Sequence, residues 1–468
     1  MSRRREALWL AGLVAFGLAA RVAFVTRVDT RPTFSGGDGG FYLTIAQNLA
    51  NGYGLVFGRL ATYRTEPVIT AGPLYPIYLA AFYVVFGGYE THPIHDPPIP
   101  FARADPWILG ARLGQAVIGA LTVAAVYWLG RRLWGGRGGL VAAGILALDP
   151  RFIVETGGIY TETFFTGLLV TGLAVYVVGH QRAQTRWYAL AWFVLGLAAL
   201  ARPIALVLFP ALCLHVWLCR PRAWAWKQTL VLGGILALVL APWFVRHYLI
   251  YGNFDVLGSS AASHFWLGVI RNGQWEGLDR FVDEWLAMAG GDPDYPPYLR
   301  AALAVIAQNP VRFVQLLGLK LARAYLQPAG TVFFAGPSLK AMLVEVAAGR
   351  ASLPALLGDT TFWPKLAMYV FHCGTIGLGL AAMGRTRRRW RETLPPILAI
   401  LVISGTYTLL TLIPRYIFPI MPFFTVFAAE ALVALWRRPA LSPGLLGQRG
   451  LGRLASGPAE NPYPEHRA

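Results

Sequence analysis

The chain has 468 residues, of which 56% are hydrophobic and only 14% are charged. A soluble domain carries roughly 45–50% apolar and about 25% charged residues, so this composition excludes an ordinary water-facing surface. The formal net charge of +18 would suit a nucleic-acid-binding protein. The basic residues, however, lie in short clusters between apolar runs, which is typical of positive-inside membrane topology, and we therefore expect no nucleic-acid partner.

The first apolar run, residues 8–25, follows an arginine cluster at residues 3–5. We therefore expect a cytoplasmic N-terminus. The run is long enough to stay in the bilayer and no small-residue cleavage pattern follows it, so we do not interpret it as a signal peptide. Residues 27–107 then form a first long outer loop. Within that loop, residues 73–87 are apolar but short and open with prolines, which favours an interfacial or re-entrant helix over a span.

The later apolar runs alternate with basic clusters that we expect to lie inside. This alternation predicts an all-α membrane protein with about ten transmembrane helices (between about eight and thirteen) and juxtamembrane helices in its outer loops. It places both termini in the cytoplasm and the chain in the cytoplasmic membrane. The predicted spans cover residues 8–25, 108–130, 138–153, 162–179, 187–201, 203–219, 228–245, 362–383, 394–412 and 416–436.

Residues 246–361 form a second long outer region with charged, proline-containing and amphipathic parts. Two stretches in it, 311–325 and 331–343, are marginal as spans. Residues 437–468 are rich in Gly, Pro and Ser and have no apolar period, which predicts a disordered cytoplasmic tail. The membrane domain is therefore expected to cover residues 1–436.

The cysteines and histidines give little sign of a metal centre. Cys213, Cys219 and Cys373 all lie in apolar stretches, so we interpret them as small buried hydrophobes and not as disulfides or metal ligands. No His/Cys group has the spacing of a zinc site. His92 and His95 lie close together in a proline-rich loop, where a metal is only a minor alternative.

Several arginines fall on the predicted outer side, against the positive-inside bias. Each could extend to the lipid headgroups or pair with a carboxylate. Together they suit a phosphate or pyrophosphate, because the planar guanidinium binds phosphate in bidentate fashion. These residues are Arg64, Arg112, Arg202, Arg246, Arg323 and Arg415.

Asp38 lies in a glycine-rich run just after the first span. The glycines allow the backbone to turn tightly and to approach a ligand. An amphipathic helix is predicted to follow over Phe41 to Ala50, with Tyr42 on its apolar face. Asp38 would then lie near the positive end of the helix dipole, which favours an ionised carboxylate. The alternative is that Asp38 merely caps this helix.

The other outer acidic candidates are Glu66, Glu155 and Glu162. Glu162 begins the fourth predicted span, two residues after Tyr160. An ionisable group at that depth in a membrane protein indicates function by default. Its alternative interpretation is an ion pair with one of the outer arginines.

In their order along the chain, these residues resemble an integral-membrane glycosyltransferase of the GT-C type. The nearest group is the bacterial relatives of the dolichyl-phosphate-mannose protein mannosyltransferases and of the lipid A aminoarabinose transferase. The resemblance covers roughly residues 8–436. The chain departs from it in having Gly39 where many relatives have a second acid, and His247 where Asn is common. The matching motifs are Asp38 with Tyr42, Ala46 and Leu49, Gly52 to Gly54, Pro73 to Pro76, Phe86-Gly87, Arg112-Leu113, Glu162, Arg202-Pro203, Pro242 to Arg246, and Arg415 to Pro422.

The resemblance implies transfer of a sugar from a polyprenyl-phosphate donor, with inversion, at the outer face of the membrane. Asp38 would be the general base, and Glu162 would orient the acceptor or share a cation. Mg²⁺ or Mn²⁺ is a possible cofactor, and no other cofactor is implied. The partners would be the lipid-linked donor, membrane lipids, and a lipid, glycan or protein acceptor. Arg64, Arg202, Arg246 and Arg415 would bind the donor phosphate, and Tyr42, Tyr63, Glu66, Tyr160, His264 and Tyr416 would contact substrate.

Two other functions remain open. A transporter or flippase for a lipid-linked sugar would also need many spans and phosphate-binding arginines. Transporters keep polar groups near the bilayer midplane, whereas here they gather at the outer edge, which favours an interfacial enzyme. A scaffold protein with a decayed site is the second alternative, because Gly39 replaces an expected acid.

Overall fold

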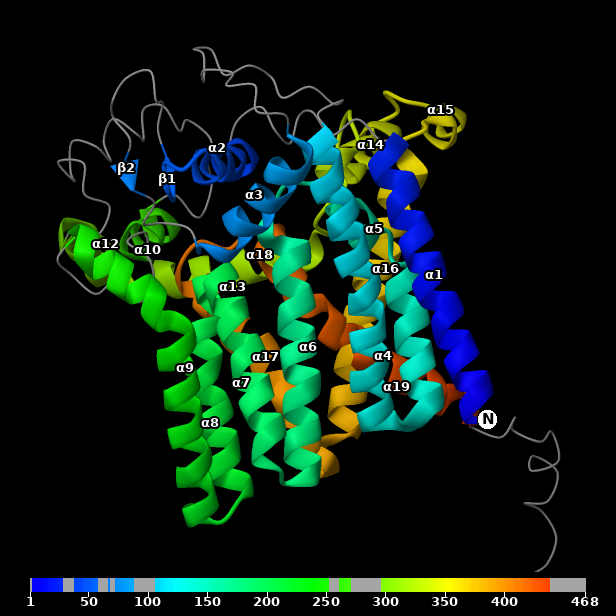
Figure 1. The fold of residues 1–468 in the computed structure, drawn as a ribbon. Helices are drawn as coiled ribbons and strands as arrows, with labels where there is room; N and C mark the ends of the chain where they lie inside the picture. The colour runs from blue at the N-terminus through cyan, green and yellow to red at the C-terminus, as the bar shows by residue number, and fades with distance from the viewer. Residues whose placement is uncertain are drawn as a thin grey trace, which may run out of the picture.

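The computed structural model describes residues 2–27, 38–57, 66–67, 72–87, 106–251, 261–270 and 296–437. This part of the chain is a helical bundle with short helices gathered at one end (Figure 1). Two strands of two residues each, β1 (Val56–Phe57) and β2 (Glu66–Pro67), pair antiparallel beside α2. The helices are α1 (Arg3–Arg27), α2 (Asp38–Ala50), α3 (Leu74–Phe86), α4 (Pro106–Leu148), α5 (Pro150–Val154), α6 (Thr161–Arg182), α7 (Thr185–Ala201), α8 (Leu208–Cys219), α9 (Arg222–Tyr251), α10 (Ala261–Ile270), α12 (Pro296–Gln308), α13 (Pro310–Leu326), α14 (Leu339–Ala347), α15 (Leu353–Gly358), α16 (Phe362–Arg385), α17 (Trp390–Leu409), α18 (Pro414–Ile417) and α19 (Met421–Arg437), with short 3₁₀ turns that include η3 (Glu155–Gly157), η4 (Pro203–Val207) and η6 (Arg387–Arg389).

The predicted all-α membrane fold is confirmed. Among the described residues, seven helical segments are long and apolar enough to cross a membrane, or eight if the bent pair α12 and α13 is one span. The two helices of that pair meet at 109°, so the marginal stretch 311–325 belongs to a strongly bent segment. The seven segments are α1, α4, α6, α9, α16, η6 with α17, and α18 with α19.

Helix α4 contains two of the predicted spans, because it turns back on itself. Gly135 has φ 80°, a conformation that favours glycine, and it interrupts the helical backbone. A Cβ added to Gly130 would lie 3.2 Å from the Cα of Gly139, and one added to Gly139 would lie 2.7 Å from the carbonyl oxygen of Tyr127. The two halves of α4 therefore pack closely as an antiparallel hairpin.

Helices α7 and α8 fall where the fifth and sixth spans are predicted, but with 17 and 12 residues they are shorter than the seven spanning segments. Helix α7 packs against α6 and α9, and α8 packs against α9 and α17. Trp192 of α7 and Leu212 of α8 are fully buried in the main core. Both helices are thus part of the bundle, while the count of ten spans stays a prediction.

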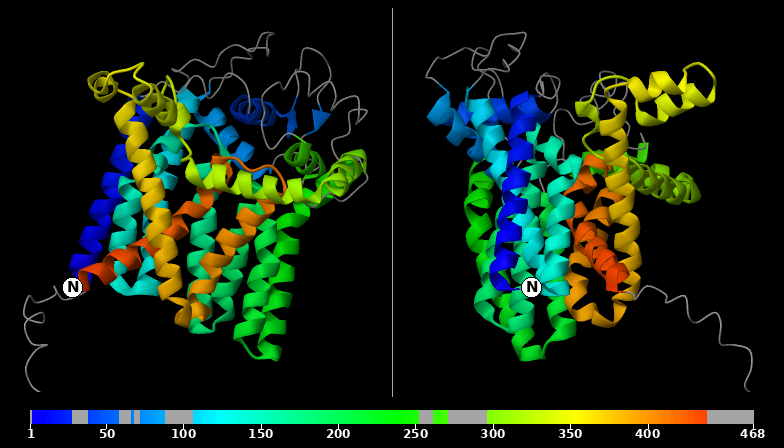
Figure 2. Two further views of the ribbon diagram at one scale, coloured as in Figure 1. Left: turned by 180° about the vertical axis from the view of Figure 1, so that it is seen from behind. Right: turned by 90° about the vertical axis from the view of Figure 1, so that its right-hand side faces the viewer.

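The bundle has two chemically different ends (Figures 1 and 2). The end that carries α2, α3, α14 and α15 is called the site end below, and the opposite end the distal end. The N-terminus lies at the distal end, where Glu6 of α1 accepts a hydrogen bond from Tyr127 (2.6 Å) and pairs with Arg131 (3.0 Å). The predicted inner clusters at 131–137, 182–186, 220–227 and 385–391 all adjoin helix ends at this distal end.

Helix α3 fulfils the expectation of a short apolar helix over residues 73–87, and it has 13 residues. It packs against α2 and α4 at the site end, where Tyr75, Leu79 and Trp107 form a second, smaller core. The hydroxyl of Tyr75 donates to Gln115 (2.9 Å), whose amide in turn donates to the carbonyl of Gly158 (2.8 Å). These bonds link α3 to the loop that precedes α6.

A buried polar group holds α5, the short helix between α4 and α6, against α16. Asp149 caps α5 and accepts from Nε of Arg151 at 2.9 Å. Nη1 of Arg151 lies 2.6 Å from Nδ1 of His372, whose Nε2 lies 2.9 Å from the carbonyl oxygen of Tyr325. Because buried charges are costly unless they are paired, this group fixes the loop that carries Glu155.

Candidate active site

Asp38 is the first residue of α2, which begins three residues before the predicted helix. Its carboxylate therefore lies in the first turn, beside the positive end of the helix dipole. The side chain is 53% exposed and its Oδ2 accepts a hydrogen bond from Nη2 of Arg415. Asp38 is thus open to solvent on one side and ion-paired on the other.

Glu162 connects Arg415, which pairs with Asp38, to Arg202. It is the second residue of α6 and its side chain is only 2% exposed. Its Oε1 lies 2.7 Å from Nη1 of Arg202 and 3.2 Å from Nε of Arg415. The ion pair that the sequence left as the alternative for Glu162 is therefore present, with two arginines. Asp38, Arg415, Glu162 and Arg202 form one continuous charged group, which we call the site cluster.

Backbone geometry explains why these two arginines meet. Arg202 is the residue after the last turn of α7, in extended backbone before Pro203, so its side chain leaves the helix end. The residue before a proline is biased away from helical conformation, which ends α7 at this point. Arg415 follows Pro414 in the four-residue helix α18, where α17 turns into α19. Both arginines therefore lie in turns at the site end.

Tyrosine rings surround the site cluster. The guanidinium of Arg415 lies 4.5 Å from the ring centre of Tyr160, and that of Arg202 lies 5.3 Å from the ring centre of Tyr416. Cation–π contacts of this kind strengthen when they are shielded from water. Burial, and then the charge of Asp38, raise the pKa of the Tyr42 hydroxyl. This hydroxyl therefore stays neutral beside the site cluster.

Glu155 adds a third acidic group, in the turn before α6. Its side chain is 3% exposed, and its Oε2 has no hydrogen-bond partner among the described residues. Burial, followed by the negative charge of Glu162, raises the pKa of Glu155 from 4.5 to about 8, while Arg415 opposes this shift. Glu155 is therefore predominantly neutral at pH 7.

Sequence and fold comparisons each find similar proteins. Residues 106–245 match the family of dolichyl-phosphate-mannose-protein mannosyltransferases. Over 134 residues the chain is 30% identical to the dolichyl-monophosphooligosaccharide–protein glycotransferase AglB of Haloferax volcanii, which is 27% of this chain and 12% of that protein. The archaeal oligosaccharyltransferase of Archaeoglobus fulgidus, tethered to an acceptor peptide, superposes with a TM-score of 0.56 at 14% identity, over 93% of this chain and 50% of that one. The chain has the fold of a GT-C membrane glycosyltransferase.

Two further GT-C structures are similar. The Archaeoglobus fulgidus AglB in complex with an inhibitory peptide and a dolichol-phosphate has a TM-score of 0.55 and 14% identity, covering 92% of this chain and 50% of that one. ArnT of Cupriavidus metallidurans in the apo state has a TM-score of 0.43 and 16% identity, covering 91% and 78%. The chain spans about half the length of the Archaeoglobus protein. Its match to the Haloferax protein covers only 12% of that protein. The two Archaeoglobus structures, with TM-scores of 0.56 and 0.55, confirm at the level of fold the GT-C resemblance inferred from the sequence motifs.

The structure brings together six of the predicted site residues. Asp38, Glu162, Arg202 and Arg415 form the site cluster, and Tyr160 and Tyr416 contact its arginines. Charges of the site cluster act on the pKa values of Tyr42 and His264, so these two residues lie near it. For His264, burial lowers the pKa, and the charge of Asp38 opposes that shift.

Other predicted residues lie apart from the site cluster or outside the described residues. Arg246 donates to the carbonyl of Leu55 (2.7 Å) and its guanidinium lies 4.9 Å from the ring centre of Trp243. It therefore contacts the segment after α2 and not the first turn of α2. Arg112 is buried in α4. Tyr63, Arg64, the side chain of Glu66, His92 and His95 lie outside the described residues.

The described residues at the site end do not fit a divalent cation by themselves. Mg²⁺ requires a near-octahedral set of oxygen ligands. One carboxylate oxygen of Asp38 and one of Glu162 face guanidinium groups, and the four charges balance. The described residues at this end bring no three acidic, histidine or cysteine donors together. The chemistry below is therefore derived from the side chains alone.

The contribution of Tyr407 was not predicted, and neither was the unpaired state of Glu155. Tyr407 of α17 stacks on Tyr416, with ring centres 4.8 Å apart. No spacing in the sequence relates residues 407 and 416 to the loops that carry Asp38. Glu155 was an acidic candidate, but the sequence does not show that it is buried and unpaired. Its side chain lies close to Gly330, where an added Cβ would be 3.5 Å from its Oε1.

The raised pKa of Glu155 predicts a pH-dependent stability. The folded protein keeps the proton of Glu155 at a pH where the unfolded chain releases it. The stability that the protonated side chain contributes is therefore fully present below pH 4.5 and is lost as the pH rises to about 8. Glu155→Gln removes this dependence of stability on pH. The thermal unfolding midpoint of the variant in detergent should therefore rise relative to that of the wild type between pH 5 and pH 9. Parallel midpoints for the two proteins over that window would contradict the assignment.

Proposed function

We propose that the chain transfers a sugar from a polyprenyl-phosphate-linked donor to an acceptor hydroxyl, with inversion, at the outer face of the cytoplasmic membrane. One observation carries this proposal: a half-exposed carboxylate is ion-paired to one of two neighbouring arginines, at the end of the bundle where α2 and α3 lie. A lipid-borne glycosyl phosphate presents an electrophilic carbon beside an anionic phosphate. The carboxylate suits the acceptor that attacks this carbon, and the arginines suit the phosphate.

Arg202 and Arg415 are the proposed phosphate-binding groups. Guanidinium groups hold phosphate oxygens in bidentate geometry, and fixed cations stabilise the charge that develops on a leaving phosphate. Two such groups would repel each other in a shielded site. The Oε1 of Glu162, which lies 2.7 Å from Arg202 and 3.2 Å from Arg415, offsets that repulsion. Glu162 is thus assigned as a positioning residue rather than as a base.

Asp38 is the proposed general base. It accepts the proton of the acceptor hydroxyl while the oxygen attacks the anomeric carbon. The bond from that carbon to the phosphate oxygen breaks, and its electron pair leaves with the polyprenyl phosphate beside Arg202 and Arg415. General base catalysis typically contributes about 10²–10⁴-fold. Because Arg415 contacts both Asp38 and Glu162, it links the base to the leaving-group side of the site.

Tyr42, Tyr160 and Tyr416 supply aromatic and hydroxyl contacts for the sugar and the acceptor. The dolichol-phosphate and the acceptor peptide named for the Archaeoglobus protein support a lipid-phosphate donor and an acceptor outside the bilayer core. The acceptor class here stays open among lipid, glycan and protein. Arg64, Arg246, Tyr63, Glu66 and His264 remain candidates for contacts with the rest of the donor.

A flippase for a lipid-linked sugar is the second candidate. Substrate sites of secondary transporters lie near the bilayer midplane. The site cluster instead joins helix ends: the first turns of α2 and α6, the end of α7 and the turn at α18. This location favours chemistry at the interface.

Asp38→Asn tests the base. We expect a loss of transfer of at least about 100-fold, the lower limit of a general base contribution, because the amide cannot accept the acceptor proton. The measurement is mass spectrometry of envelope glycans in a strain that lacks the protein and is complemented with each variant. Asp359→Asn, at the site end beside Thr361, is the matched control and should transfer normally.

Purified Asp38→Asn protein should keep the wild-type thermal unfolding midpoint within a few degrees and still bind undecaprenyl phosphate. An Asp38→Asn variant that restores wild-type glycans would remove Asp38 as the base. Unchanged glycans on deletion of the wild-type gene, with undecaprenyl phosphate still bound, would favour a scaffold.

The proposed orientation predicts opposite labelling of two exposed positions. Lys340 of α14 lies at the site end and Arg388 of η6 at the distal end. In a chain without its three native cysteines, Lys340→Cys should react with an impermeant maleimide in intact cells. Arg388→Cys should react only after the membrane is opened. Labelling of Arg388→Cys in intact cells would place the site cluster on the cytoplasmic side.

A further inference from the structure

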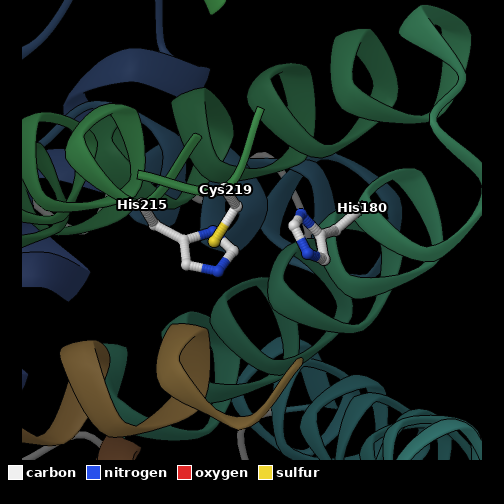
Figure 3. Close-up of side chains that lie close together, drawn as sticks. All are labelled: His180, His215 and Cys219. Atoms are coloured by element: carbon white, nitrogen blue, oxygen red, sulfur yellow. The ribbon is translucent and has the colours of Figure 1, made fainter. Parts of the chain in front are cut away.

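We propose that His180, His215 and Cys219 form a binding site for a thiophilic divalent cation of the Zn²⁺ type, at the distal end of the bundle. The site lies away from the site cluster, so it is independent of the proposed glycosyl transfer. Figure 3 shows the three side chains converging between α6 and α8. One donor atom from each residue lies within 4.8 Å of the other two.

Helix geometry creates the convergence. His215 and Cys219 are four residues apart in α8, so they lie on one face of that helix. His180 comes from the last turn of α6, and its ring centre lies 4.7 Å from that of His215. The apolar stretch around Cys219 predicts only a buried hydrophobe. His180 comes from another helix, so no local spacing reveals the site.

The hydrogen bonds of His215 define which ring nitrogen can bind a cation. Its Nε2 lies 2.8 Å from the carbonyl oxygen of Arg391, and a carbonyl only accepts, so Nε2 carries the proton. Nδ1 then has the lone pair, which the Tyr176 hydroxyl approaches at 2.8 Å. That hydroxyl also has the carbonyl of Leu212 as an acceptor at 3.0 Å, so it can release Nδ1. A metal-bound histidine usually donates its other N–H to a carbonyl or carboxylate, as His215 does here.

A tyrosine hydroxyl also contacts the ring of His180. Its Nδ1 lies 3.2 Å from the hydroxyl of Tyr188, which assigns Nε2 as its ligand atom. Tetrahedral Zn²⁺ with bonds of about 2.0–2.3 Å brings its ligand atoms to roughly 3.3–3.7 Å of one another. The donors at 4.8 Å or less need only small side-chain rotations to reach that spacing. A water molecule or a backbone carbonyl would complete the coordination.

The ligand set selects the class of metal. Thiolate with imidazole is a ligand set for Zn²⁺ and not for Mg²⁺ or Ca²⁺. Cys219 is only partly buried, which leaves a route for the cation to enter. Bound there, the cation would join the end of α6 to α8, next to the start of α17.

Co²⁺ titration of the full chain, purified without a polyhistidine tag and treated with a chelator, tests the site. We expect one equivalent of Co²⁺ to give a near-ultraviolet sulfur-to-cobalt charge-transfer band that Zn²⁺ abolishes. Cys219→Ser should lose the band. Cys213→Ser, the matched control on the same helix, should keep it, and so should Asp38→Asn at the other end of the bundle.

Thermal unfolding gives a second readout that does not depend on the cobalt spectrum. Zn²⁺ should raise the unfolding midpoint of the wild type and of Cys213→Ser by several degrees and leave that of Cys219→Ser unchanged. His180→Gln should also lose the Zn²⁺ effect, which keeps the test decisive if Cys219→Ser folds poorly. No charge-transfer band in the wild type, or an equal band in Cys219→Ser, would overturn the proposal.

Discussion

The site end depends on one buried carboxylate, that of Glu162. Its Oε1 lies between Nη1 of Arg202 and Nε of Arg415, and the side chain is almost fully buried. Removing a single partner from such a group leaves an uncompensated buried charge, which is costly. α6, α7 and α18 are therefore held in one arrangement by electrostatics as well as by packing. Through Arg415 the same arrangement extends to Asp38 and thus to α2.

A second buried polar group, formed by Asp149, Arg151 and His372, supports the site cluster. Asp149, Arg151 and His372 fix α5 and α16 relative to each other. The turn that they hold carries Glu155 and leads directly to Tyr160 and Glu162. The cluster therefore rests on fixed backbone, so that Glu162 meets Arg202 and Arg415 without a large reorganisation. Preorganised groups of this kind contribute most to stabilising a developing charge.

The sequence allowed the fold class and much of the site to be predicted, for a specific reason. Apolar runs and arginine clusters define helices and their ends, so arginines at the wrong end, such as Arg202 and Arg415, stand out without any structure. Pairing could not be predicted in the same way. Arg246 has the same outer position, yet it contacts Leu55. The convergence of His180 with Cys219 depends on helix packing that no local pattern encodes.

The most direct test of this account is a double-mutant cycle on Glu162 and Arg202, measured by denaturant unfolding in detergent. Glu162→Gln should lower the free energy of unfolding by about 3–5 kcal/mol, because it removes the carboxylate that pairs with both Arg202 and Arg415. Arg202→Gln should lower it by less, because Glu162 keeps its pair with Arg415. The double variant should lose less than the sum of the two, by about 0.5–3 kcal/mol. Strictly additive losses would show that Glu162 and Arg202 do not act as a pair, and would contradict the arrangement on which the proposed chemistry depends.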